Sequence, residues 1–192
     1  MFCYVHGFNS GRQSRSGRLL EEALGLPVFR PDYDSARPFQ ENFESLLYQC
    51  RAIAPGSVIM GASLGGFMAY RLAGRLRRNC VLFNPVTNPY EDLEQFLGGQ
   101  TNLSTGKAYE FTRELLESYR GIKAERADVD AEIFVSDCDE VLQNNVERVR
   151  RTYAGRIHVI HTPHSIEDFR PFAPYILAMG GQPSGSGKGA AQ

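Results

Sequence analysis

Short apolar runs alternate along this chain with longer segments in which apolar residues recur every three or four positions. The short runs are typical of buried strands, and the three-and-four spacing is typical of amphipathic helices. Six runs are candidate strands, at residues 2–6, 28–30, 58–60, 80–83, 133–136 and 157–161. Several are apolar throughout, as expected for strands buried on both faces of a parallel sheet. The alternation predicts an α/β fold, with a mostly parallel sheet of about six strands flanked by helices.

Two intervening segments show the helical spacing most clearly. Pro38 suits the first turn of a helix, and the face that follows it carries Phe39, Phe43, Leu46, Leu47, Cys50 and Ile53. A second predicted helical face carries Leu142, Val146, Val149 and Tyr153. Right-handed connections bring the carboxyl ends of the strands to one edge of the sheet, and the sites of α/β folds lie at that edge.

The interval between Asn84 and Ile133 breaks the alternation, because it contains no convincing strand. Its two helical patterns are Tyr90, Leu93 and Leu97, and then Phe111, Leu115, Tyr119 and Ile122. We expect a helical insertion at about residues 86–130, and we favour a cap over the site rather than a long crossover beside the sheet. The domain is expected to span residues 1–179. The Gly/Ser-rich residues 180–192 have no apolar anchor and are predicted to form a disordered tail.

Composition narrows the classes of protein that need to be considered. With 192 residues the chain is one domain long, and its formal net charge of −1 gives no overall field to attract nucleic acid or an anionic membrane. No segment approaches the roughly 20 consecutive apolar residues of a membrane span, and no secretory leader precedes the first strand. The four cysteines show no zinc-site spacing. We expect a cytoplasmic protein without a metal; no pattern indicates its oligomeric state.

One pentapeptide, Gly61-Ala62-Ser63-Leu64-Gly65, lies between a predicted strand and a predicted helix. Gly-x-Ser-x-Gly in this setting is the signature of a nucleophile elbow, a turn so tight that larger residues at the glycine positions would collide. The turn lifts the hydroxyl of Ser63 above the sheet, where a base can reach it. The alternative is a glycine-rich helix start used for close packing or for phosphate binding. The elbow predicts a serine hydrolase.

A serine nucleophile needs a base and an orienting acid, which in this fold follow in the order Ser, Asp, His. His164 lies just after the last predicted strand, and we assign it as the base, with His161 as the second choice; His158 and His161 fall within that strand, where packing is the better interpretation. Asp137 and Asp139 both follow the preceding strand. Asp139 could instead cap a helix beginning near Glu140, and position alone does not separate the two aspartates.

The oxyanion of the reaction needs two backbone N–H donors. One is expected from Leu64, the residue after the nucleophile, and the other from Phe8 in the loop after the first strand. Gly7 would let this loop turn toward the site. His6 is interpreted as a structural support of the loop.

Three segments make the chain similar to a known family. They are Tyr4-Val5-His6-Gly7-Phe8-Asn9-Ser10, Gly61-Ala62-Ser63-Leu64-Gly65-Gly66 and Asp139-Glu140-Val141-Leu142. Their order and spacing, over roughly residues 2 to 178, resemble the YqiA-like esterases, which are small bacterial α/β-hydrolases. The resemblance implies an α/β-hydrolase fold and an esterase acting on acyl esters or thioesters. It also implies that Asp139 is the acid and that His164 is the base.

The sequence therefore predicts a serine esterase or thioesterase with a triad of Ser63, His164 and Asp139 and an oxyanion hole of the Phe8 and Leu64 N–H groups. It needs no metal or organic cofactor, and its partner is a small-molecule acyl ester or thioester. No residue is assigned to substrate binding, although Phe8, Tyr90 and Tyr109 could line an acyl pocket or belong to the core. Two alternatives stay open: an acyltransferase on the same scaffold, and a hydrolase-like binding protein without turnover.

Overall fold

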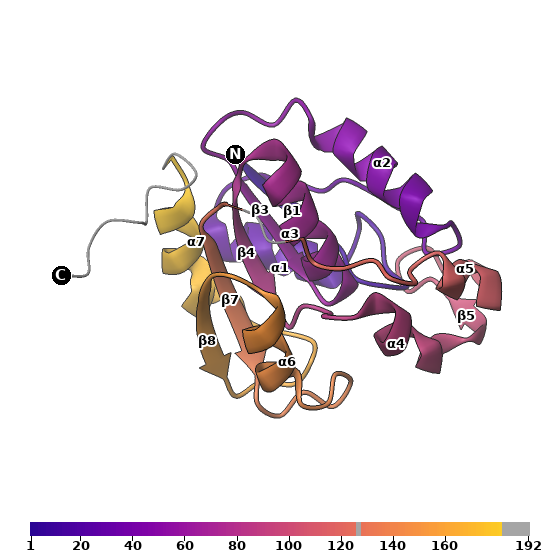
Figure 1. The fold of residues 1–192 in the computed structure, drawn as a ribbon. Helices are drawn as coiled ribbons and strands as arrows, with labels where there is room; N and C mark the ends of the chain where they lie inside the picture. The colour runs from indigo at the N-terminus through magenta and orange to yellow at the C-terminus, as the bar shows by residue number, and fades with distance from the viewer. Residues whose placement is uncertain (126–127, 182–192) are drawn as a thin grey trace.

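The computed structural model describes residues 1–125 and 128–181 and contains one six-stranded sheet with the order β2-β1-β3-β4-β7-β8 (Figure 1). Every neighbouring pair in this sheet is parallel. Its strands are β1 (Phe2–Val5), β2 (Val28–Phe29), β3 (Val58–Ala62), β4 (Asn79–Phe83), β7 (Ala131–Ser136) and β8 (Arg156–Ile160). All six predicted strands are thus confirmed, with ends displaced by one or two residues. The order reverses direction between β1 and β3, and such a switch point opens a crevice at the carboxyl ends of the strands.

Helices cover both faces of the sheet. They are α1 (Arg15–Leu24), α2 (Phe39–Cys50), α3 (Leu64–Leu76), α4 (Pro89–Leu93), α5 (Arg113–Glu117), α6 (Asn145–Thr152) and α7 (Ala173–Met179), with 3-10 turns η1 (Glu94–Phe96) and η2 (Arg170–Phe172). Within the described ranges, no helix is both long and apolar enough to cross a bilayer.

Alternation along β1 divides the core in two. Cys3 and Val5 face one side of the sheet, where α2, α3 and α6 contribute to the buried cluster. Phe2 and Tyr4 face the other side, which α1, η2 and α7 cover. Because successive side chains of a strand point to opposite faces, a strand covered on both sides is apolar throughout. This explains why the short apolar runs identified the strands.

The insertion between β4 and β7 differs from its prediction. It contains α4, η1 and α5, but also an antiparallel hairpin of β5 (Gly98–Thr101) and β6 (Ala108–Phe111). The expectation of no strand here is therefore wrong, and Phe111 ends β6 instead of belonging to a helix. In Figure 1 the labels α4, β5 and α5 gather on the side of the molecule away from α7 and β8. Ser118 Oγ accepts a hydrogen bond of 2.9 Å from Phe39 N, which joins the insertion to α2.

Several predicted helix ends also change. Ile53 lies beyond the end of α2, and Pro38 is its N-cap instead of a residue in its first turn. Leu142 precedes α6 and Tyr153 caps it, so Asp139 does not cap a helix at Glu140. The predicted tail lies outside the described residues from position 182 onward.

Candidate active site

Ser63 lies at a sharp bend between β3 and α3, where its φ of 54° places a non-glycine residue in the left-handed region. The flanking glycines make this bend possible. A Cβ at Gly61 would lie 2.2 Å from the carbonyl oxygen of Gly65, and a Cβ at Gly65 would lie 2.2 Å from the carbonyl oxygens of Val5 and His6. No side chain fits at such distances. Strained backbone of this kind is concentrated at functional sites, and the geometry is the one that the Gly-x-Ser-x-Gly pattern predicts.

The loop after β1 lies beside this serine. A Cβ at Gly7 would be 3.6 Å from Ser63 Cβ. Phe8, the next residue, therefore belongs to a backbone segment close to the bend. Leu64 is the first residue of α3, and the first N–H groups of a helix have no partner within the helix. The two segments expected to supply the N–H donors thus adjoin Ser63.

His164 and Asp139 are brought together by the loops that follow β8 and β7. His164 Nδ1 lies 2.8 Å from Asp139 Oδ2, and the side chains are 13% and 2% exposed. The second carboxylate oxygen accepts bonds from Val141 N and Leu142 N at 2.9 and 2.8 Å. Burial alone would raise the pKa of Asp139. The hydrogen bond to His164, the charge of that imidazole and the two backbone N–H groups lower the pKa by more than burial raises it, so the pKa of Asp139 lies below its ordinary value. Asp139 is thus held as a carboxylate that orients the imidazole.

Asn84, directly after β4, connects His164 to the segment that holds Ser63. Its Nδ2 donates to His164 O at 2.9 Å, and its Oδ1 accepts from Ser136 N at 2.7 Å. The adjoining backbone contacts the bend, because Ser63 N donates to Phe83 O at 3.0 Å and Val86 N donates to Ser63 O at 3.1 Å. No hydrogen bond joins Ser63 to His164 in the described part of the chain, and bonds of this kind often tighten only when a substrate is present.

We predict that Asn84→Ala lowers the free energy of unfolding by about 2–4 kcal/mol, because it leaves the buried Ser136 N–H unpaired and removes the bond to His164. Asn84 is 1% exposed and has a φ of 42°, so alanine adds backbone strain. Urea unfolding followed by circular dichroism measures the loss. Asn84→Gly is the matched control, since it removes the same bonds without the strain. An alanine variant as stable as wild type would contradict this account.

A second histidine–aspartate pair lies on the same two loops. His161 Nδ1 is 2.7 Å from Asp137 Oδ1, but these side chains are 83% and 51% exposed. The expectation that His161 packs within the strand is wrong, because it follows the end of β8. His158 does lie within β8, where it stacks on Phe134 and its Nε2 lies 2.6 Å from Glu132 Oε2. Of the two candidate pairs, the one with His164 is enclosed by protein.

His6 fixes the start of the loop that carries Phe8. Its Nε2 lies 3.0 Å from Asp32 Oδ1, its Nδ1 lies 2.9 Å from Gly7 O, and its ring stacks on Tyr33 at 4.2 Å. The hydrogen bond with His6 is the main reason why the pKa of Asp32 is lowered, which its partial burial opposes. These contacts agree with the structural role expected for His6; the partner Asp32 was not predicted.

The lowered pKa of Asp32 predicts a pH-dependent contribution to stability. Its ionised form is favoured in the folded protein, so the contribution is complete above the unfolded pKa of about 3.9 and is lost as the pH falls through the lower folded value. Because the carboxylate side chain is 39% exposed, we expect Asp32→Asn to cost only about 1 kcal/mol at pH 7. The difference from wild type should shrink between pH 5 and 3 in urea titrations. Glu91→Gln, at an exposed position, is the control, and a difference that grew on acidification would contradict the prediction.

The hairpin of the insertion packs on the Phe8 loop. Phe8 contacts the rings of Phe96 and Phe111 at centroid distances of 5.2 and 4.9 Å. Asn9 accepts a bond from the hydroxyl of Tyr109 and donates to Gln100 Oε1 at 2.6 Å. A pocket of about 380 Å³ lies between this hairpin, the loop after β1 and residues 32–45, and Ser63 and His164 do not line it. The insertion thus contacts the site through the Phe8 loop.

The family described as "Uncharacterised protein family (UPF0227)", the YqiA family, matches residues 1–180. The chain belongs to this family. The match covers every described strand of the large sheet and the segments that carry Ser63, Asp139 and His164. The family is the one that the sequence resembled.

Solved structures show the fold of this YqiA-family protein. It is similar to Est1E from Butyrivibrio proteoclasticus, with a TM-score of 0.69 and 13% identity over 92% of this chain and 86% of that one. A monoacylglycerol lipase of Paleococcus ferrophilus has a TM-score of 0.65 and 15% identity over 93% and 94%. Alpha/beta hydrolase domain-containing protein 10 from mouse has a TM-score of 0.65 and 13% identity over 93% and 87%. The chain has the α/β-hydrolase fold.

Proposed function

We propose that this YqiA-family protein is a serine hydrolase that cleaves carboxylic esters or thioesters. The observation that carries the proposal is the enclosed pair of His164 and Asp139, 2.8 Å apart, at the edge of the sheet where Ser63 occupies a left-handed bend. Relatives in fold support the same reaction class, since one is a monoacylglycerol lipase and Est1E has been solved with ferulic acid bound.

In the proposed reaction Ser63 Oγ attacks the carbonyl carbon while His164 Nε2 takes the hydroxyl proton. Asp139 holds the opposite ring nitrogen and stabilises the imidazolium that forms. The N–H groups of Phe8 and Leu64 bind the oxygen that becomes negative. Collapse of the tetrahedral intermediate breaks the bond to the alcohol or thiol, which takes the proton from His164. Water then attacks the acyl-enzyme with His164 again as base, which releases the acid and frees Ser63.

The insertion is proposed to form a cap over the acyl group. Its hairpin contacts Asn9 and its rings contact Phe8, so it lies against the loop that supplies one oxyanion donor.

The free cysteines of the chain fit the cytoplasmic location that the sequence predicts.

A fluorophosphonate probe tests the proposal, because an activated serine displaces its fluoride and becomes covalently labelled. We expect wild type and Ser104→Ala to be labelled and Ser63→Ala not to be. Hydrolysis of p-nitrophenyl and CoA esters of graded chain length then identifies the acyl group and distinguishes ester from thioester. Labelling that persists in Ser63→Ala would place the nucleophile elsewhere. A wild type that is neither labelled nor active would favour the non-catalytic binding protein.

A further inference from the structure

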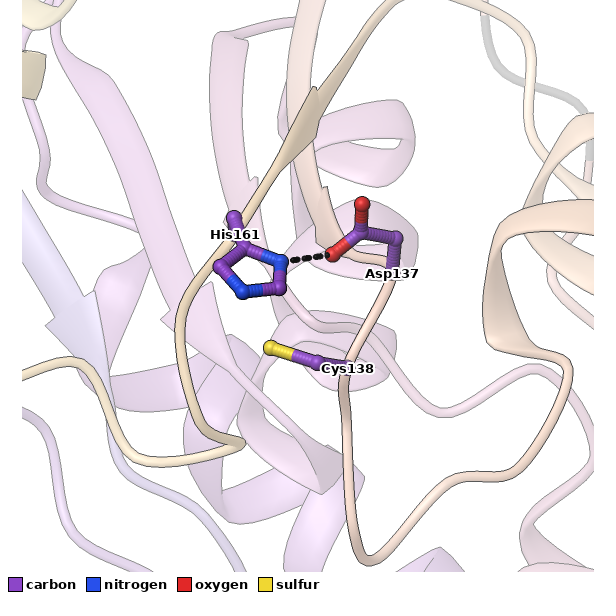
Figure 2. Close-up of side chains that lie close together, drawn as sticks. All are labelled: Asp137, Cys138 and His161. Atoms are coloured by element: carbon purple, nitrogen blue, oxygen red, sulfur yellow. Dashed lines mark hydrogen bonds and ion pairs between the residues drawn. The ribbon is translucent and has the colours of Figure 1, made fainter.

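Beside the proposed catalytic pair, three side chains of different chemistry meet on the surface: Asp137, Cys138 and His161 (Figure 2). One potential ligand atom from each lies within 4.8 Å of the other two. Figure 2 shows the sulfur of Cys138 pointing toward the imidazole of His161, whose Nδ1 is bonded to Asp137 at 2.7 Å. The three residues are exposed, so solvent and ions reach them.

The parallel register of the sheet brings these residues together. Ser136 and Ile160 are the last paired residues of β7 and β8, so the next residues on each chain segment, Asp137 and His161, face each other. Asp137 N donates to Ile160 O at 3.0 Å, and the hydroxyl of Ser136 donates to Thr162 O. Cys138 N in turn donates to Ser136 Oγ at 3.1 Å. The backbone that carries the three side chains is therefore fixed on both loops before any ion binds.

We propose that Asp137, Cys138 and His161 form a binding site for a divalent transition-metal ion of the zinc type. A thiolate, an imidazole and a carboxylate are ligands that zinc prefers, whereas a thiolate disfavours Mg²⁺ and Ca²⁺. Ligands around tetrahedral zinc lie roughly 3.3–3.8 Å apart, given bond lengths of about 2.0–2.3 Å. To reach that geometry the exposed side chains rotate, the 2.7 Å hydrogen bond between His161 and Asp137 is broken, and the imidazole binds through its unprotonated nitrogen. A water molecule completes the coordination.

Binding requires a change at Cys138. Its thiol now lies 3.1 Å from Thr162 O, to which it donates. When the metal binds, the thiol proton leaves to solvent, the sulfur electron pair forms the metal bond, and the bond to Thr162 is lost. The hydroxyl of Ser136, 3.5 Å from the sulfur, keeps its bond to Thr162 O and continues to join the two loops. Loss of a proton on binding makes the affinity rise with pH.

The sequence did not show this site, because its histidine is far from the other two ligands along the chain. Asp137 and His161 are 24 residues apart and meet only through the pairing of β7 with β8. The expectation of a chain without a metal site rested on contiguous Cys and His motifs. The ion would connect the loop that carries Asp139 with the loop that carries His164. Metal binding by these three side chains is independent of the proposed esterase activity.

Cobalt titration of the full chain, reduced with a non-thiol phosphine, tests the proposal. We expect one Co²⁺ per chain, with a thiolate-to-metal charge-transfer band and the visible bands of a four-coordinate site. Cys138→Ser should abolish the charge-transfer band, and Asp137→Asn and His161→Ala should each weaken binding at least about tenfold. The other three cysteines are buried, so they do not compete for the ion. Asp168 is an exposed carboxylate at the far end of the loop after β8, where it pairs with Arg170, so Asp168→Asn is the matched control and should bind as wild type does.

Thermal unfolding provides a second measurement. Zinc at saturating concentration should raise the Tm of wild type and of Asp168→Asn, but not that of Cys138→Ser, because only a chain that binds the ion gains stability from it. Absence of the cobalt bands in wild type would overturn the proposal. Unchanged affinity in His161→Ala and Asp137→Asn would do so too, since the ion would then bind the thiol alone. Fluorophosphonate labelling of Ser63 in the same samples reports the esterase proposal separately.

Discussion

Replacing His164 by alanine is expected to lower kcat for ester hydrolysis at least about 1,000-fold, because the chain would lose the group proposed to take the proton of Ser63. The variant should stay folded, since His164 lies on a loop and its backbone carbonyl, which accepts from Asn84, is retained. Steady-state kinetics with a p-nitrophenyl ester, together with circular dichroism, measure both quantities. Asp139→Asn should give a loss of similar size, because an amide no longer stabilises the imidazolium.

His161→Ala is the matched control for this prediction. The two histidines lie on the same loop, and each pairs with an aspartate, at distances of 2.8 and 2.7 Å. Because His161 is exposed, its loss should change kcat less than about threefold in metal-free buffer. The opposite result, a large loss in His161→Ala and a small one in His164→Ala, would move the base to the exposed pair and make Asp137 the acid.

Gly65→Ala is expected to destabilise the fold by at least about 3 kcal/mol. The added methyl group would overlap the carbonyl oxygens of Val5 and His6, which belong to the backbone at the end of β1. A flexible side chain could move aside, but these atoms are backbone, so the end of β1 and the start of α3 have to move apart. The separation would also displace the loop that carries Phe8, so activity should fall together with stability.

Gly99→Ala separates this effect from the general cost of adding a methyl group. Gly99 lies in β5, and the nearest atom to a Cβ there is Glu110 Oε2 at 4.0 Å. We expect a change of less than about 0.5 kcal/mol at this position. Urea unfolding of the two variants and wild type gives the comparison. Equal stability of Gly65→Ala and Gly99→Ala would mean that α3 can shift without cost, contrary to the close contact with β1.

The strands of the large sheet could be predicted because burial on both faces leaves a contiguous apolar run. The hairpin could not, since β5 consists of Gly98, Gly99, Gln100 and Thr101 and is only half buried. Contacts from elsewhere, such as that between Asn9 and Gln100, hold it in place. Phe111 was wrongly predicted to lie in a helix. It ends β6 shortly before α5 begins, so its spacing of four residues to Leu115 resembles that of a helical face. Neither α1 nor α7 was predicted.

The candidate site was predictable where a motif requires a particular backbone. Gly61, Ser63 and Gly65 define a bend from the sequence alone, and the structure shows that bend. Position in the sequence favoured His164 over His161, but it did not separate Asp139 from Asp137. The pairs are separated by 24 and 25 residues, and both form hydrogen bonds. Burial distinguishes them, and burial depends on how the loops fold back over the sheet. Asn84 gave no signal, because a lone asparagine after a strand is ordinary.

The loop after β1 is anchored from two directions. Asp32 holds His6 on one side, and Tyr109 and Gln100 hold Asn9 on the other, with Phe8 between them. A displacement of the hairpin is therefore expected to move the backbone amide of Phe8 as well. The proposed oxyanion donor is thus positioned in part by a surface hairpin about a hundred residues further along the chain, so substitutions in that hairpin are expected to change the rate of the proposed reaction while Ser63, His164 and Asp139 stay in place.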